Sequence, residues 1–105
     1  MPKSIIEIVN EAKLLNAAVV SLPRILILVT LKDLGKDGAT FRELKAALDI
    51  NDGTLFANLK GLVKMGYIKM SMVKLENKKM QSFSITPEGK AMLDAACSWF
   101  CSLKE

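Results

Sequence analysis

The chain has 105 residues, 50% of them hydrophobic, a formal net charge of +4, two cysteines and no histidine. This length and composition fit one domain over residues 1–105 with a substantial core, and they exclude a low-complexity or repetitive chain. The sequence has no nucleophile–base pair, phosphate-binding loop or paired carboxylates, which argues against an enzyme and gives no reason to expect a cofactor.

The most membrane-like run, residues 14–31, contains Asn16, Pro23 and Arg24. A charge and a helix breaker would then lie near the centre of a bilayer, so the run is better explained as the end of one core helix and the start of another. The first residues also lack the basic-then-apolar pattern of a signal peptide. The sequence therefore predicts no membrane contact and a cytoplasmic location.

Cys97 and Cys101 lie four residues apart near the end of the sequence. On a helix they would share a face, which is poor geometry for a disulfide, and no histidine is present to join a metal site. We expect two small buried hydrophobic residues and no bound metal. A redox or thiol-metal sensor is the alternative.

A first helix is predicted over residues 4–16, where Ser4 and Glu7 have the spacing of a capping box. Hydrophobic residues follow at helical spacing, namely Ile5, Ile8, Val9, Ala12 and Leu15. Ile6 and Leu14 fall outside this stripe, which suggests contact with a second copy of the chain. A wide core-facing surface is an equally simple explanation.

A second helix is predicted to begin after Ser21, a good cap, with Pro23 in its first turn. Its apolar run, residues 25–31, is hydrophobic on almost every side and is typical of a central core helix. Gly35 and Gly38 follow and predict that the helix ends in a turn.

A short third helix is predicted from the capping box of Thr40 and Glu43, with Arg42 on its outer side. After a tight turn, the stretch 51–66 begins with two cap residues and ends at a glycine, and its leucines lie at i, i+4 and i+7. Two helices joined by a turn of three or four residues have the spacing of a helix-turn-helix.

The outer face of the helix at 51–66 carries small or cationic residues. These are Gly53, Thr54, Ala57, Lys60, Gly61 and Lys64. Small residues let a helix approach a groove wall closely, and lysines pair with phosphates. An ordinary amphipathic surface helix also has lysines outside, so this helix alone does not decide the function.

A β-hairpin is predicted over residues 67–86, because the periodicity changes from helical to alternating after residue 66. Its polar tip carries Lys74, Lys78 and Lys79. Six lysines lie between residues 58 and 81 against one acidic residue, Glu76, whereas the rest of the chain has nine basic and ten acidic residues. Such a localised basic segment is typical of a nucleic-acid interface. The alternative is a solvated hairpin whose lysines discourage edge pairing.

The last helix is predicted over residues 87–103, with Thr86 as its cap and Pro87 in its first turn. Few of its positions are polar, so on a monomer it would expose a large apolar patch. We therefore predict a dimerisation helix anchored by Trp99 and Phe100. A tryptophan lining a ligand pocket is the alternative.

This order of elements resembles the MarR/ArsR-like winged helix-turn-helix transcriptional regulators, in particular their compact archaeal and bacterial members. The resemblance implies a mainly α fold with a two-stranded β wing (α+β). The segments that carry it are residues 41–45 (FRELK), 52–55 (DGTL), 59–62 (LKGL), 66–68 (GYI) and 85–89 (ITPEG).

The resemblance implies a homodimer on partly palindromic double-stranded DNA, with helix 51–66 in the major groove and wing 67–86 on the flanking backbone or minor groove. The expected DNA-contacting residues are Arg42, Thr54, Ala57, Asn58, Lys60, Gly61, Lys64, Lys74, Lys78 and Lys79. The expected dimer contacts, from helices 4–16 and 87–103, are Ile6, Leu14, Trp99 and Phe100. Nothing in the pattern identifies a small-molecule effector.

The sequence departs from this family at the centre of the recognition helix. Ala57 and Asn58 stand where relatives often have arginine or histidine, and Phe56 replaces a usual small polar residue. Arginine to guanine is the commonest specific base contact, so weak direct readout is expected. A winged-helix module that binds another protein through the same face is the alternative function. The ArsR-type cysteine metal motif is absent from the helix-turn-helix sequence.

Overall fold

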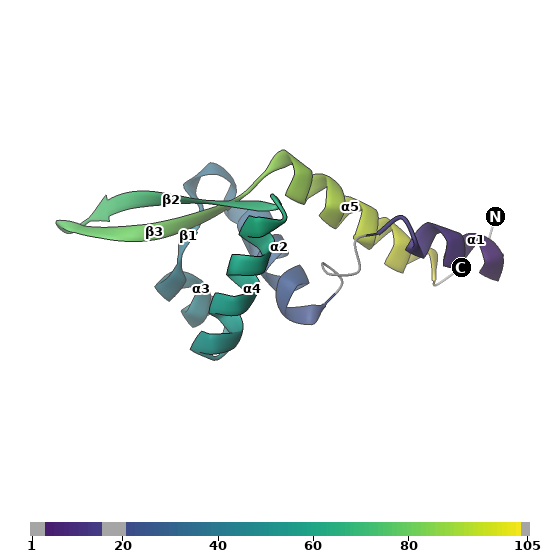
Figure 1. Cartoon of the computed structure of the whole chain (residues 1–105), viewed down its shortest axis with the longest axis horizontal. Coiled ribbons are helices and arrows are strands. Elements are labelled where there is room, and N and C mark those ends of the chain that lie inside the picture. Colours follow the sequence, from purple (N-terminus) through teal and green to yellow (C-terminus); the bar gives the residue numbers. More distant parts are fainter. Residues whose placement is uncertain (1–3, 16–20, 104–105) are drawn as a thin grey trace.

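The computed structural model describes residues 4–15 and 21–103. Its α-helices are α1 (Ile5–Ala12), α2 (Leu22–Leu34), α3 (Phe41–Leu48), α4 (Asp52–Lys64) and α5 (Pro87–Ser102), with a short 3-10 helix at Gly35–Asp37. Its strands are β1 (Ala39–Thr40), β2 (Ile68–Leu75) and β3 (Lys78–Ile85). The element order is that of the predicted winged helix (Figure 1).

Each of the five helices begins at a side-chain cap, in which an oxygen accepts from the backbone N–H three residues further on. The capping residues are Ser4, Ser21, Thr40, Asn51 and Thr86. At α3 the capping box is complete, because Oε1 of Glu43 also accepts from the N–H of Thr40 at 3.0 Å. This backbone hydrogen bond, together with one from the Thr40 hydroxyl, lowers the pKa of Glu43 below its ordinary value of 4.5.

The sheet is antiparallel with strand order β1-β3-β2. The hairpin of β2 and β3, called the wing below, turns at Glu76 and Asn77, whose φ angles are 50° and 66°. Two consecutive left-handed residues define a type I′ turn, whose twist matches that of the flanking strands. Gly38 precedes β1 and lies so close to the carbonyl of Phe83 that a side chain there would collide with it.

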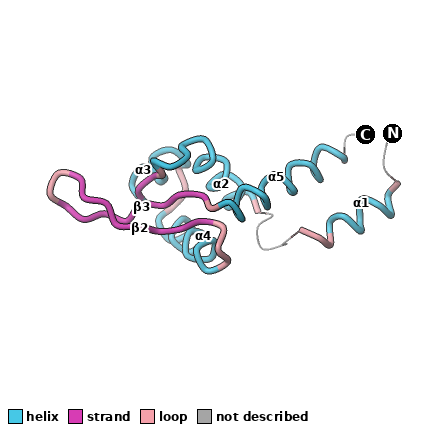
Figure 2. The backbone as a smooth tube through the Cα atoms, turned by 90° about the horizontal axis from the view of Figure 1, so that it is seen from above, coloured by secondary structure: helices cyan, strands magenta, loops and turns pink. Residues whose placement is uncertain are grey.

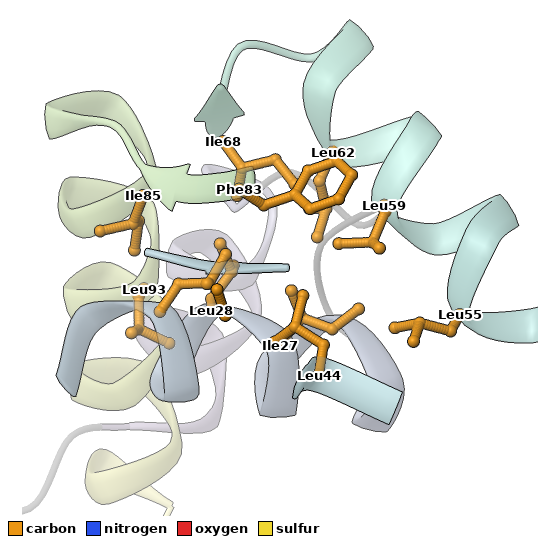
Figure 3. Close-up of a cluster of buried hydrophobic side chains, with 12 residues drawn as sticks. Ile27, Leu28, Leu44, Leu55, Leu59, Leu62, Ile68, Phe83, Ile85 and Leu93 are labelled. Atoms are coloured by element: carbon orange, nitrogen blue, oxygen red, sulfur yellow. The ribbon is translucent and has the colours of Figure 1, made fainter. Parts of the chain in front are cut away.

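The core lies where α2, α3, α4 and the sheet meet (Figure 3). Leu55, Leu59 and Leu62 form the buried stripe of α4, as their spacing predicted. Opposite them are Ile27, Leu28 and Leu31 of α2, Leu44 of α3, Ile68, Phe83 and Ile85 of the sheet and Leu93 of α5. Burial of these side chains holds α4 and the base of the wing in one rigid unit.

The molecule is elongated, with extents of 56 × 25 × 21 Å and a radius of gyration of 15.4 Å. A compact chain of this length would have a radius of gyration of about 13 Å. The wing projects at one end, and α1 lies with the end of α5 at the other (Figures 1 and 2). None of the described helices combines the length and hydrophobicity that a membrane crossing requires.

Three details differ from the sequence prediction. Strand β1 adds a third strand to the predicted two-stranded wing, but its two residues are too few to give an alternating pattern. Helix α1 ends at Ala12 rather than at residue 16, which lies outside the described residues. Cys97 and Cys101 are exposed, not buried, because the second half of α5 extends beyond the core toward α1 (Figure 1).

Candidate nucleic-acid interface

The turn between α3 and α4 brings the start of α4 close to the outer side of α3. Asp49 ends α3 in the left-handed conformation, with φ 51°, and Asn51 then caps α4 through the N–H of Thr54 at 2.8 Å. Lys45 of α3 forms an exposed ion pair with Asp52 in the first turn of α4. The predicted helix-turn-helix spacing is therefore present, and Arg42 lies on the exposed side of α3.

Helix α4 has an outward face and two flanks once its leucines are buried. At about 100° per residue, Gly53, Ala57 and Lys64 point directly away from the core. All three are exposed, as is Lys60 beside them. This face has few bulky polar side chains. A partner would meet two lysines and a backbone that small side chains leave accessible.

The flank of α4 that faces α2 is held by an arginine from α2. Nε of Arg24 donates to Oδ1 of Asn58 at 2.9 Å, and Nδ2 of Asn58 donates to the carbonyl of Thr54 at 2.8 Å. Gly61 lies beneath the guanidinium, since a Cβ there would be 2.7 Å from Nη2 of Arg24. Asn58 and Gly61, expected at the DNA, are thus half-buried against α2.

The other flank of α4 faces the wing and is apolar. Phe56, 57% exposed, lies with Val63 beside a hollow of about 190 Å³ that reaches Met70 and Phe83 of the wing. Lys60 and Gln81 also line this hollow. In the sequence, Phe56 stands out only as a departure from the family pattern, because its place beside Met70 depends on the sheet register.

The register of the wing separates its lysines onto two faces. Residues directly opposite on β2 and β3 share a face. The pairs Ile68↔Ile85, Met70↔Phe83, Met72↔Gln81 and Lys74↔Lys79 alternate with Lys69↔Ser84, Ser71↔Ser82, Val73↔Met80 and Leu75↔Lys78. Since Met70 and Phe83 line the hollow beside α4, Lys74 and Lys79 lie on the side of the wing that faces α4, whereas Lys78 lies on the other.

Lys69 belongs to the opposite face as well. There it lines a polar hollow of about 270 Å³ with Lys36, Ser84 and Lys90. The basic segment read from the sequence therefore divides between two sides of the sheet, and only part of it adjoins α4.

The residues predicted for dimer contacts lie at the far end of the molecule. Helix α1 has no buried residue, and Ile6 and Leu14 are 69% and 82% exposed. Nε1 of Trp99 donates to the carbonyl of Ile8 at 2.9 Å and so fastens α1 to α5 within one chain. Phe100 is exposed beside it, in an edge-on contact with Trp99 at 5.2 Å between ring centres.

No group of three or more His, Cys, Asp or Glu side chains that could hold a metal ion occurs among residues 4–15 and 21–103.

Residues 24–103 match the family model described as "Winged helix DNA-binding domain". The chain belongs to this family. The match runs from the first turn of α2 to the end of α5. It therefore includes α4 and the wing, with the lysines that both carry. This is a DNA-binding family rather than an enzyme family.

Solved structures show the same winged-helix fold. The S. aureus MepR–DNA complex aligns over 94% of this chain and 80% of its own with a TM-score of 0.73 and 19% identity. The smu.1704 protein of Streptococcus mutans UA159 aligns over 81% and 83%, with a TM-score of 0.66 and 22% identity. Bordetella bronchiseptica BpsR, whose DNA binding is regulated by 6-hydroxynicotinic acid, aligns over 92% and 67%, with a TM-score of 0.70 and 13% identity. Curated protein sequences gave no significant match.

These findings confirm the predicted winged-helix fold and a winged helix DNA-binding domain. The individual DNA and dimer contacts stay predictions. The structural feature that sequence reasoning missed is Arg24, which lies 34 residues before its partner Asn58. Its only sequence signal is a glycine at position 61, one turn beyond Asn58, in a helix that would otherwise favour alanine.

Proposed function

We propose that this chain is a homodimeric transcription regulator that binds double-stranded DNA with α4 in the major groove and the wing on the flanking backbone or minor groove. The observation that carries the proposal is the cross-strand pair of Lys74 and Lys79 on the α4 side of the wing. Like charges directly opposite destabilise a hairpin, so the pair is best explained by an anionic partner. Lys60 and Lys64 add exposed positive charge on α4.

Within this proposal, Arg42, Lys60, Lys64, Lys74 and Lys79 neutralise phosphates, and Lys78, on the other side of the wing tip, contributes less to phosphate binding. Ala57 makes the closest approach to bases, with Thr54, Asn58 and Gly61 on the flank of α4 beside it. Phosphate contacts supply affinity and orientation, whereas base contacts and DNA shape supply selectivity. A cytoplasmic location belongs to the same proposal.

The test is selection of bound duplexes from a random pool, combined with the mass of the protein in solution. Enrichment of a partly palindromic site by a particle of twice the chain mass is the expected result. A dimer that enriches no sequence would reduce the proposal to non-specific or architectural binding, and no retention of any duplex at low salt would refute it.

The homodimer is supported by the apolar surface at the end remote from the wing. Ile6 of α1, Leu14 shortly after α1 and Phe100 of α5 are exposed there, and a monomer rarely leaves such a patch uncovered. Phe100→Glu should therefore reduce the mass in solution to that of one chain and weaken DNA binding. Ser98→Glu, which adds the same charge at another exposed position of α5, is the matched control.

A protein-binding module is the second candidate, and the apolar hollow beside α4 favours it. Phe56 and Val63 could accept an apolar side chain of a partner there. Phe56→Ala distinguishes the two, because loss of a protein partner without loss of duplex affinity would support this candidate. A parallel loss of DNA affinity would support DNA binding at the same surface.

A further inference from the structure

The outward face of α4 has no arginine, but an arginine lies against its flank. Arg24 projects from the first turn of α2, where Pro23 limits the backbone and Ser21 caps the helix by accepting from the N–H of Arg24 at 3.4 Å. From this fixed base its side chain reaches α4, and Nε donates to Oδ1 of Asn58 at 2.9 Å. Two helices are thus joined by a hydrogen bond at the edge of the proposed DNA-binding surface.

Gly61 makes room for this arginine. A Cβ at position 61 would lie 2.7 Å from Nη2 of Arg24, closer than real contacts allow, and a tight 3.3 Å from Cζ. The atoms in conflict belong to the end of a flexible side chain, so alanine at 61 would displace the guanidinium rather than unfold α4. Glycine costs about 1 kcal/mol relative to alanine within a helix, and the position of Arg24 gives a physical reason for that cost.

Asn58 is fixed by these contacts from both ends of its amide. Its Oδ1 accepts from Arg24, and its Nδ2 donates to the carbonyl of Thr54 at 2.8 Å. An amide oxygen can accept twice and an amide nitrogen can donate twice, so one acceptor and one donor position remain. One acceptor and one donor are what an asparagine uses to read adenine in the major groove.

We propose that Arg24 is a positioning residue for sequence recognition, acting through Asn58. It orients the Asn58 amide so that its remaining acceptor and donor meet one base pair. The inference rests on the proposed DNA-binding function. Lysine cannot replace Arg24 in this role, because an ammonium is a point charge on a flexible stem without the planar Nε–H that meets Oδ1.

The test compares wild type with Arg24→Lys, Gly61→Ala, Asn58→Ala and the double variant Arg24→Lys/Asn58→Ala. Affinities are measured for the selected duplex and for duplexes with single base-pair changes. Arg24→Lys keeps the charge, so affinity for unrelated duplexes should stay unchanged. The preference for the selected base pair over its replacements should fall by about 5- to 100-fold at one position of the duplex. That position should be the same in all four variants. The double variant should lose no more than Asn58→Ala, because the two residues act as one unit.

The control is Lys32→Arg, the reverse exchange on the same helix at an exposed ion pair with Asp94. It should leave discrimination unchanged. The side-chain amide NMR signals of Asn58, recorded without DNA, give a second readout. They should move in Arg24→Lys and Gly61→Ala but stay in place in Lys32→Arg.

Two outcomes separate this inference from the proposed function. Selective wild-type binding that Arg24→Lys retains in full, or amide signals of Asn58 that do not move, would overturn the positioning role alone. A wild-type chain that binds no duplex would refute the DNA-binding function and, with it, the role of Arg24 in recognition.

Discussion

The wing register gives a quantitative prediction about salt. Lys74 and Lys79 face α4 as a directly opposed pair, and Lys78 points to the other side of the hairpin. We expect the double variant Lys74→Gln/Lys79→Gln to lose two phosphate contacts. Each contact contributes about 0.9 to the slope of log affinity against log salt, so the slope should fall by about 1.8. Over a fourfold rise in salt, the wild type should then lose about 12-fold more affinity than the variant.

The same substitution should make the free protein more stable. Like charges directly opposite on a hairpin cost a few tenths of a kcal/mol, so removing both lysines should raise Tm by about 1–3 °C. A variant that binds more weakly while folding more stably identifies a site kept for a partner rather than for the fold. The single variant Lys78→Gln should change the slope less than either Lys74→Gln or Lys79→Gln.

Fluorescence anisotropy with a labelled duplex at several salt concentrations measures the slope, and thermal unfolding measures Tm. An unchanged slope in Lys74→Gln/Lys79→Gln would refute the phosphate role of this face. A larger effect of Lys78→Gln than of Lys79→Gln would show that the DNA lies on the opposite side of the wing from α4.

Gly89→Ala should destabilise the fold by about 2 kcal/mol or more, because a Cβ at this buried position would collide with the backbone carbonyl of Tyr67. The same exchange at Gly53, where a Cβ would make only an ordinary contact at 3.7 Å from Oδ1 of Asn51, should instead be neutral or stabilising by up to about 1 kcal/mol. Denaturant unfolding of both variants is the measurement, and equal effects would count against the collision. Glu43→Gln should be less stable than wild type near neutral pH, because the folded chain lowers the pKa of Glu43 through its hydrogen bonds from Thr40. That advantage exists above the unfolded pKa and is lost as the pH falls through the lower folded pKa, so Tm values recorded from about pH 7 down to about pH 3 should converge. A difference in Tm that stays constant across this range would contradict the assignment.

The fold was largely predictable because its signals are local. Capping residues gave the starts of the helices nearly to the residue, the leucine stripe gave the buried side of α4, and the change to alternating periodicity located both strands of the wing. Each of these signals depends on residues within a few positions of one another. Strand β1 was not predicted, because two residues are too few to show a periodicity and because its partner, β3, lies about 40 residues later in the sequence.

The candidate site was only partly predictable, because its decisive features are non-local. The charge excess of residues 58–81 is visible in the sequence, but which lysines share a face depends on the register fixed by the turn at Glu76 and Asn77. The exposure of Cys97 and Cys101 was predicted wrongly, since hydrophobic residues on nearly all sides of α5 gave no way to choose its packed side.

The separation of the wing lysines onto two faces also suggests how DNA selectivity can arise without an arginine on the outward face of α4. Lys74 and Lys79 lie on the same side as α4, so their phosphate contacts would fix the depth and angle at which α4 meets the duplex. Small residues such as Ala57 would then contribute through close approach rather than through hydrogen bonds. Under that geometry a single oriented amide, Asn58, has a large effect, because a groove contact discriminates only when the donor and the acceptor are both held in place. Selectivity would then depend on Arg24 and Gly61, and affinity on the wing, so substitutions on the two flanks of α4 should change different measurable quantities.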